Sequence, residues 1–397
     1  MNWFNKHFNN TSTKFLLIIA VLMCILLISA DYGCVLQDLF LGDADWPMFK
    51  FNSERTSATD DFDFDTIELL WRYEYDLFEQ AGASRISPAA SSDMVVIPTR
   101  HFLNCINTND GRIIWSQYIG ENYSSPVIYK GNVIMSSFGA IYSFNLRSGS
   151  FIWNKNLTKE KEYINGGASV AAINDDKIYY GLRGRADSEG YLYCINARDG
   201  STIWKYHTDG TVQTSPIVTE GKVIFGSDDH SIHCLDADSG DNIWTYYTGD
   251  IIRSSPAVHN NRVFFGSNDS YVYCLDIEDG NMVWRFKTGG KVTATPTISE
   301  DKLFVSSNDQ FLYCLNIDEG RFVWKHRTGD SMYTSPTVCG NKILLGFGDS
   351  IYCLDTKDGS LFWSYKLDDV GTSTPLTIHN GKLFFRTTRF VYCFSLS

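Results

Sequence analysis

The sequence lacks the short motifs that identify the common catalytic sites. It has no Walker-type phosphate loop, no G-x-S-x-G nucleophile turn and no H-E-x-x-H zinc motif. Its ten cysteines never approach a C-x-x-C spacing, which argues against a cysteine metal site. The histidines are scattered over strand and turn positions of a repeat described below. We therefore expect no catalytic, cofactor-binding or metal-binding residues.

Positive charge is also scarce. The chain has 34 Lys and Arg against 46 Asp and Glu, so its formal net charge is −12. A protein that binds nucleic acid through a broad basic face needs the opposite balance, because phosphate contacts dominate such binding. We expect no nucleic-acid partner.

The longest predominantly apolar run is short for a membrane span. It covers Phe15 to Ala30, whereas a transmembrane helix needs about 20 such residues. The run suits the apolar part of a secretory signal. We expect residues 1–34 to direct export, which leaves a cleaved signal, a retained membrane anchor or lipidation at Cys34 open. Against lipidation, Asp31 stands where a lipobox has an aliphatic residue.

One repeat of about 40 residues accounts for most of the chain. Tryptophans stand at positions 71, 115, 153, 204, 244, 284, 324 and 363. Self-similarity at this period is typical of repeat architectures. In the unit Ile252 to Gly290, four runs rich in Val, Ile, Phe and Tyr alternate with turn residues, which predicts a four-stranded antiparallel meander. An Asp279-Gly280 pair joins the last two strands, and Gly tolerates the positive φ of such a turn.

The two ends of the repeat region predict how the array closes. A glycine precedes each of these tryptophans by four residues except Trp71, which has Ile67 there, so Trp71 lies on a fourth strand without a third strand before it. Residues 373–397 contain three strand-like runs and no fourth. Joining both ends completes an eighth sheet and removes open edges. We predict an all-β, eight-bladed β-propeller of four-stranded antiparallel blades over residues 67–397.

Proline placement indicates which strand lies innermost. A Ser-Pro or Thr-Pro pair occurs in the first strand of seven units, and a proline cannot donate to a ladder. We therefore expect the first strand at the channel, with Val170 in the proline position of the third blade. Before the first blade, residues 35–66 form a lead-in whose run Asp60 to Asp65 is interpreted as a solvated acidic linker.

Seven cysteines share one register, the middle of the third strand: Cys105, Cys194, Cys234, Cys274, Cys314, Cys353 and Cys393. Equivalent positions of neighbouring blades should lie about 10 Å apart, the spacing of packed sheets. A disulfide needs Cα atoms within about 7 Å. We interpret these cysteines as buried apolar residues, and Cys339, outside the register, as a free thiol in a turn.

The repeats resemble a known family. The stretch Asn196 to Trp204 and its counterpart Leu235 to Trp244 resemble the tryptophan-docking repeat of pyrroloquinoline-quinone (PQQ)-like β-propellers, and the lead-in Asp45 to Phe49 is similar to the segment that precedes them. The resemblance implies one of two branches. Quinoprotein dehydrogenases hold PQQ and Ca²⁺ over the channel, with a tryptophan platform and often an adjacent-cysteine disulfide. BamB-type propellers are non-catalytic scaffolds of outer-membrane protein assembly.

The second branch fits better. There is no adjacent cysteine pair, and every tryptophan of the propeller is used by the repeat register. We expect a non-catalytic, monomeric propeller without cofactor, located outside the cytoplasm and either secreted or membrane-associated through its N-terminus. Its partner would be an envelope or surface protein. A PQQ-dependent dehydrogenase and a glycan-binding surface module are the alternatives.

Loop lengths point to a face where a partner binds. Trp244 to Ser255 spans 11 positions, whereas Trp71 to Ser87 and Trp153 to Ser169 each span 16. A third insertion covers Arg183 to Gly190, between the second and third strands of the third blade. All three should project from one face. Their apolar and arginine residues are of the kind enriched at interfaces, and the candidate partner-binding residues are Leu77, Phe78, Tyr163, Ile164, Arg183 and Arg185.

Overall fold

The computed structural model describes residues 58–59, 65–75, 86–120, 124–137, 140–157, 169–183, 189–329, 334–369 and 375–396. The chain divides into two compact units, Met1–Asp45 and Trp46–Ser397, and all described residues belong to the second. Their regular structure is entirely β. Within the described part, no helix is long and apolar enough to cross a membrane.

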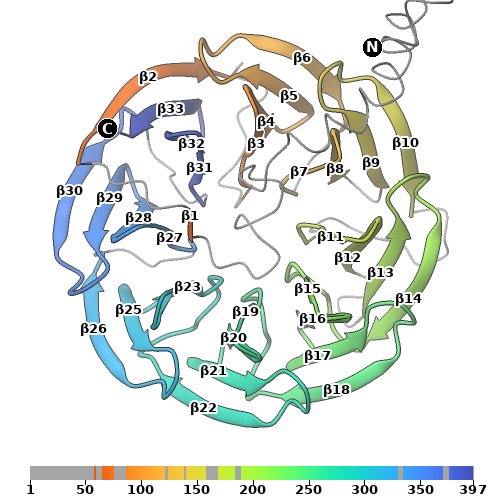
Figure 1. Ribbon diagram of the computed structural model, residues 1–397, viewed down its shortest axis with the longest axis vertical. Coiled ribbons are helices and arrows are strands. Elements are labelled where there is room, and N and C mark those ends of the chain that lie inside the picture. The colour runs from red at the N-terminus through yellow and green to blue at the C-terminus, as the bar shows by residue number, and fades with distance from the viewer. Residues whose placement is uncertain are drawn as a thin grey trace, which may run out of the picture. The chain divides into compact units, whose positions relative to one another are not determined.

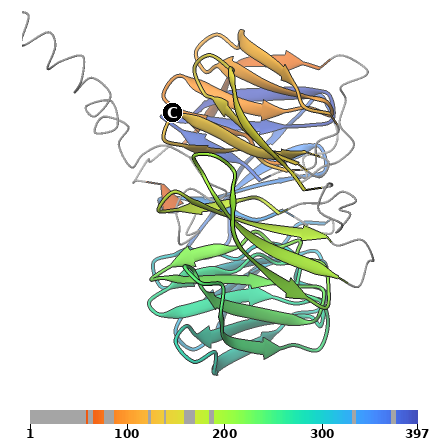
Figure 2. The same ribbon diagram turned by 90° about the vertical axis from the view of Figure 1, so that its right-hand side faces the viewer.

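Each repeat folds as the predicted meander. In blade five, β19 (Ala257–His259), β20 (Arg262–Gly266), β21 (Tyr271–Asp276) and β22 (Met282–Lys287) pair in sequence order, all antiparallel. The sheets form a ring in which the fourth strands lie outermost and the first strands innermost (Figure 1). The outer strands run from one face of the ring towards the other (Figure 2). The predicted propeller is confirmed.

The other blades repeat this order. Blade one contains β3 (Ala89–Ser91), β4 (Met94–Pro98), β5 (Phe102–Asn107) and β6 (Ile113–Tyr118). Blade two contains β7 (Val127–Tyr129), β8 (Asn132–Ser137), β9 (Ala140–Asn145) and β10 (Phe151–Asn156). Blade three contains β11 (Ala172–Asn174), β12 (Lys177–Arg183), β13 (Gly190–Asn196) and β14 (Thr202–Thr208). Blade four contains β15 (Ile217–Thr219), β16 (Lys222–Gly226), β17 (Ser231–Asp236) and β18 (Asn242–Tyr247).

The remaining three blades complete the ring. Blade six contains β23 (Thr297–Ser299), β24 (Lys302–Ser307), β25 (Phe311–Asn316) and β26 (Phe322–Arg327). Blade seven contains β27 (Thr337–Cys339), β28 (Lys342–Phe347), β29 (Ser350–Asp355) and β30 (Leu361–Lys366). Blade eight contains β31 (Thr377–His379), β32 (Lys382–Arg386), β33 (Phe390–Leu396) and β2 (Ile67–Glu74). In blade eight β2 pairs antiparallel with β33, with Trp71 opposite Cys393, which confirms the predicted closure.

Hydrogen bonds between the residues just before the first strands tie neighbouring blades together. The Ser87 amide donates to Ser125 Oγ at 2.8 Å, and the Ser215 amide donates to Ser255 Oγ at 2.9 Å. In blade three the Val170 amide makes the same bond to Ser215 Oγ at 3.0 Å. Val170 therefore takes the serine place, and Ala171, not Val170 as predicted, takes the proline place.

One strand was not predicted. Ala58–Thr59 form β1, which pairs parallel with the inner edge of β27, Ala58 opposite Val338. Close by in sequence, the Asp65 carboxylate lies 3.5 Å from Lys342 Nζ, and the Lys342 side chain is almost wholly buried. The lead-in thus adds a fifth strand to blade seven.

Tryptophan docking joins seven of the eight blades to the next. The indole N–H of Trp244 donates to the carbonyl of Ile277 in blade five at 2.9 Å. Six other tryptophans make the same bond at 2.7 to 3.3 Å: Trp71, Trp115, Trp153, Trp204, Trp284 and Trp324. Each of these rings also lies against the turn glycine of the following blade. A Cβ on Gly280 would come within 2.7 Å of the Trp244 ring, so this glycine provides both the turn and a flat surface for the indole.

The register cysteines lie in the cores between blades. All seven are fully buried and, like Cys339, carry free thiols. Burial raises the pKa of the Cys274 thiol to about 12, so it stays protonated and unreactive. Cys339 lies in β27 rather than in the expected turn, because its segment is the innermost strand of blade seven.

Replacing Gly280 with alanine should destabilise the propeller by about 2–5 kcal/mol, since it adds strain at φ 70° and displaces the Trp244 ring. Gly221→Ala is the matched control: Gly221 has φ 72° but no atom within 4 Å of the Cβ that alanine would add, so only the backbone cost of about 1–2 kcal/mol remains. Denaturant unfolding of both variants measures the difference. Equal losses of unfolding free energy in the two variants would show that displacing the Trp244 indole adds nothing to the cost of the substitution.

Candidate interaction surface on the loop face

The antiparallel order of each blade places two kinds of connection at the same end of the ring. These are the loops between second and third strands, such as residues 227–230, and the connections from a fourth strand to the next blade, such as residues 248–256. We call this end the loop face. The opposite end carries the turns that join first to second strands and third to fourth strands, and we call it the turn face.

The three predicted insertions follow strands that end at the loop face. They connect β2 to β3, β10 to β11, and β12 to β13. Leu77, Phe78, Tyr163, Ile164 and Arg185 lie outside the described residues, as does Cys34. Arg183 ends β12 opposite Gly190, and its side chain is not described. The role of these residues in binding stays a prediction.

An aspartate organises the loop between second and third strands in blades five and six. Asp269 accepts hydrogen bonds from the Tyr273 hydroxyl at 2.6 Å and from the Gly249 amide at 2.9 Å. Asp309 does the same with Tyr313 at 2.6 Å and Gly289 at 2.7 Å. Burial, followed by the bond to Asp309, raises the pKa of Tyr313 to about 12. The phenol therefore remains a donor at any physiological pH.

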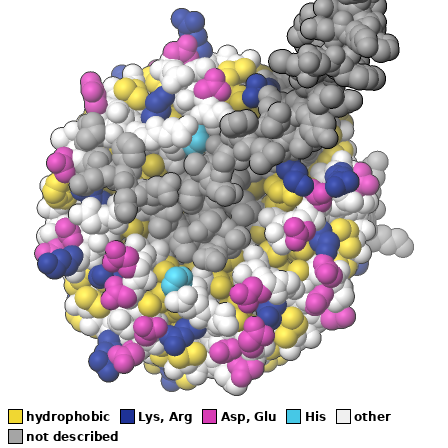
Figure 3. All heavy atoms as spheres, viewed as in Figure 1, with side chains coloured by type: hydrophobic (Ala, Val, Ile, Leu, Met, Phe, Trp, Pro, Cys, Tyr) yellow, Lys and Arg dark blue, Asp and Glu magenta, His cyan; other side chains and the backbone are white. Residues whose placement is uncertain are grey.

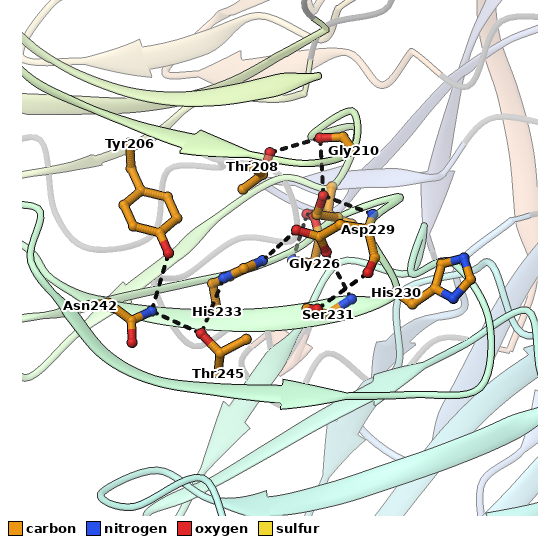
Figure 4. A network of polar contacts seen from close by, with 12 residues as sticks. Tyr206, Thr208, Gly210, Gly226, Asp229, His230, Ser231, His233, Asn242 and Thr245 are labelled. Carbon is orange, nitrogen blue, oxygen red and sulfur yellow. Dashed lines mark hydrogen bonds and ion pairs between the residues drawn. The ribbon is translucent and has the colours of Figure 1, made fainter. Parts of the chain in front are cut away.

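Blade four replaces this tyrosine with a histidine (Figure 4). His233 Nε2 lies 2.9 Å from Asp229 Oδ2, and both side chains are nearly buried. The imidazole also stacks on Phe225, at 5.1 Å between ring centroids. Burial alone would raise the pKa of Asp229. The hydrogen bond from His233, the electrostatic interaction with the same ring and bonds from Ser231 outweigh burial, so the pKa lies below its ordinary value.

The histidine links the loop to the outer strands. Thr245 Oγ1 lies 3.3 Å from His233 Nδ1, and the Asn242 amide donates to Thr245 Oγ1 at 2.9 Å. The same amide lies 3.4 Å from the Tyr206 hydroxyl of blade three. This chain of contacts runs from the loop face to the wall between blades three and four (Figure 4). No pattern in the sequence distinguished His233 except its place in a tyrosine register.

A second polar cluster lies where the loop face meets the inner strands. Asp228 forms a two-bond ion pair with Arg253, at 3.1 Å for both Nε and Nη2. Its carboxylate also accepts bonds from Thr211 Oγ1 at 2.6 Å and Gln213 Nε2 at 3.1 Å. These four donors use the carboxylate fully. Asp228 is therefore poorly placed to act as a base or as a metal ligand.

The equivalent of Asp228 in blade five is Asn268, the first residue of a glycosylation triplet. It is 8% exposed and its Oδ1 is buried without a hydrogen-bond partner among the described residues. This burial makes Asn268 a poor glycan acceptor. Across the described part of the chain, no three His, Cys, Asp or Glu side chains gather in a way that could hold a metal ion.

The ring face drawn in Figure 3 carries charged side chains of both signs around its rim, without a large area of one sign. Charged side chains also form ion pairs between blades, such as Lys222 with Glu278 at 2.9 Å and Arg262 with Asp318 at 3.2 Å. Exposed pairs of this kind contribute little stability.

Comparison with known proteins identifies the family. A family model described as outer membrane protein assembly factor BamB matches residues 137–250 and 228–395, together 259 of the 397 residues. The chain belongs to this family. The resemblance seen in the tryptophan-docking repeats is thereby confirmed.

Individual relatives are distant. The outer membrane protein assembly factor BamB of Escherichia coli K12 is 23% identical over a match that covers 33% of this chain and 44% of the relative. That of Salmonella typhimurium is 24% identical over the same shares. The chain thus spans less than half the length of the curated relatives it matches.

Solved structures confirm the fold. BamB from Moraxella catarrhalis aligns over 83% of this chain and 100% of that chain, with a TM-score of 0.67 and 18% identity. Quinohemoprotein alcohol dehydrogenase from Comamonas testosteroni aligns over 89% of this chain and 80% of that chain, with a TM-score of 0.77 and 11% identity. At these identities the similarity concerns the architecture, which scaffolds and dehydrogenases share.

Asp229→Asn should destabilise the protein at pH 7 by about 1–3 kcal/mol, because it removes a charge-assisted bond to buried His233. His233→Tyr restores the donor used in blades five and six, so its stability should stay within about 1 kcal/mol of the native chain.

The lowered pKa of Asp229 also sets a pH dependence. The ionised carboxylate stabilises the fold above the ordinary carboxyl pKa, and this contribution is lost as pH falls through the folded-state value. Denaturant unfolding of the native chain and Asp229→Asn between neutral and acidic pH checks this: their difference should shrink on acidification. A difference in unfolding free energy that does not change with pH would contradict this prediction.

Proposed function

We infer that this chain is an exported, non-catalytic propeller that serves as a protein-interaction scaffold at the cell envelope, attached to the membrane through its N-terminal segment. The observation that carries the proposal is membership in a family described as outer membrane protein assembly factors. The apolar run of residues 15–30, which lies outside the described residues, supports export and attachment. We propose a partner among the proteins of the envelope.

The loop face is the surface we assign to this partner. Its three inserted connections follow β2, β10 and β12, on blades eight, two and three, so they cluster on one part of the ring. Exposed loops on a rigid scaffold are the usual place for recognition residues. Leu77, Phe78, Tyr163, Ile164, Arg183 and Arg185 are proposed to make the contact.

A PQQ-dependent dehydrogenase is the second candidate, favoured by the high structural similarity to quinoproteins. The described residues do not fit such a centre. Asp228, the acidic side chain at the inner end of the loop face, is held by Arg253, Thr211 and Gln213, and no metal-ligand group occurs in the described part. The glycan-binding alternative has no supporting observation among the described residues.

Shortening the connections 76–85, 158–168 and 184–188 to the length used in blade four should abolish capture of the envelope partner and change the melting temperature little, because these segments lie outside the blades. Cross-linking in native membranes measures the capture. Arg147→Ala on the turn face is the control and should retain it. A loop-shortened chain that still captures the same protein would overturn the assignment.

Adding PQQ and Ca²⁺ to the purified full-length chain should leave its melting temperature unchanged. A ligand that binds the native state raises stability by mass action, so a saturable rise of several degrees would establish a cofactor site. That result would contradict the non-catalytic proposal and favour the dehydrogenase.

A further inference from the structure

The outer wall of blades five and six carries an unusual set of cations. On every fourth strand the first and third residues after the tryptophan lie on the side of the strand opposite the indole, and all of them except Thr245 are exposed. In β22 these are Arg285 and Lys287, and in β26 they are Lys325 and Arg327. All four side chains are exposed. We call this set the basic wall.

The other blades serve as internal controls for these positions. Three outer strands have neutral residues there: Ser116 and Tyr118, Asn154 and Asn156, and Thr245 and Tyr247. Two others have cations that are paired with acids: Arg72 lies 2.7 Å from Asp368, and Lys366 lies 3.4 Å from Asp349. The sixth, β14, has a single lysine, Lys205. Four cations on two adjacent strands are therefore not a requirement of the repeat.

Aromatic rings, not carboxylates, contact three of the four cations of the basic wall. Lys287 Nζ and the Arg285 guanidinium lie 4.2 and 4.7 Å from the centre of the Tyr271 ring. Lys325 Nζ lies 4.2 Å from the centre of the Phe311 ring. Within the described part of the chain, none of the four cations forms an ion pair. Cation–π contacts restrict the long side chains and leave their charge available.

Two carboxylates lie at the loop-face end of the same walls. Lys287 Nζ contacts Asp269, but through the backbone carbonyl, at 3.0 Å. The Asp269 side chain instead accepts from Tyr273 and from the Gly249 and Tyr271 amides. Asp309 is engaged in the same way in blade six. Counting both carboxylates, the region keeps a positive excess on a chain of net charge −12.

Charged residues also protect exposed strand edges from unwanted pairing. That role would apply to all eight outer strands, since each ends its sheet in the same way. Strands β6, β10 and β18 have no cation at the two outward positions. Edge protection therefore does not explain why the charge is concentrated on β22 and β26.

We propose that the basic wall binds an extended, acidic segment of a partner protein. Outward side chains two residues apart on a strand are separated by about 6.5–7 Å, which is also the spacing of same-side residues in an extended peptide. The outer edges of β22 and β26 have no strand partner among the described residues, so the backbone of such a peptide can hydrogen-bond to either edge. An anionic membrane fits less well, because it contacts a broad surface and would be repelled by the negative remainder of the propeller.

This proposal deepens the scaffold function, on which it rests, by stating the chemistry of a partner. It uses a different surface, the outer wall of blades five and six. Shortening the loop-face connections should therefore leave binding to the basic wall intact. Whether the loop-shortened chain captures the envelope partner therefore tests the loop face and does not test the basic wall.

The test measures binding of a short fluorescent peptide of alternating Glu and Val to the full-length chain by anisotropy, with the Gln-Val peptide as control. Lys325→Glu/Arg327→Glu should weaken binding at low salt by about tenfold or more. Arg147→Glu/Lys357→Glu makes the same change in net charge at exposed turn-face positions and should retain binding. Circular dichroism and melting temperature confirm that each variant is folded, and Lys325→Gln/Arg327→Gln provides a milder replacement.

Loss of binding in the wall variants alone supports the proposal. Equal weakening in the turn-face control, or no binding of the Glu-Val peptide, overturns it. A flotation assay with phosphatidylcholine vesicles, with and without phosphatidylglycerol, tests the lipid surface. The N-terminal segment contributes equally to the binding of both vesicle types. If phosphatidylglycerol increases vesicle binding, if this increase disappears in the wall variants and if the peptide does not bind, the ligand of the basic wall is a membrane and not a peptide.

Discussion

The contact between a tryptophan of one blade and the turn glycine of the next is the interaction on which the ring depends. The indole donates its N–H to a backbone carbonyl of the neighbouring blade and covers a glycine that has no room for a side chain. Blades one to six therefore each supply a glycine to the joint on one side and a tryptophan to the joint on the other. Because the joint is repeated, blade sequences can vary elsewhere while the ring keeps its geometry. The same architecture occurs in solved structures that are only 18% and 11% identical to this chain.

Most of the fold was predictable because residues in each repeat mark where its strands and turns begin and end. Alternating apolar residues, the Asp-Gly turn and the unmatched Trp71 together determine blade number and closure. Where these boundary residues are missing, the prediction is wrong. Blade three lacks proline, and its inserted residues shift the register by one, so Val170 was misplaced. Strand β1 has only two residues, and its pairing is decided by the free inner edge of β27, which no local pattern reveals.

The candidate sites were less predictable than the fold. Loop lengths indicate the loop face, but Asp228 and Arg253 meet because the ring brings a strand loop of blade four beside the connection to blade five. The basic wall has a similar origin. Arg285 and Lys325 lie 40 positions apart in the sequence, one repeat, so they occupy equivalent places on adjacent blades. Comparing such positions around the ring reveals which charges the repeat does not need.

The pairing of β2 with β33 also determines when this fold can become complete. Trp71 and Cys393 are 322 positions apart, so β2 is synthesised long before its partner. Until β33 is made, the growing chain is an open array whose first and last blades expose strand edges and apolar surface. If the chain is exported as it is made, the unfinished array must be kept from pairing with other chains throughout that time. A propeller closed by its two distant ends gains a seamless ring and accepts a late, vulnerable stage in its folding.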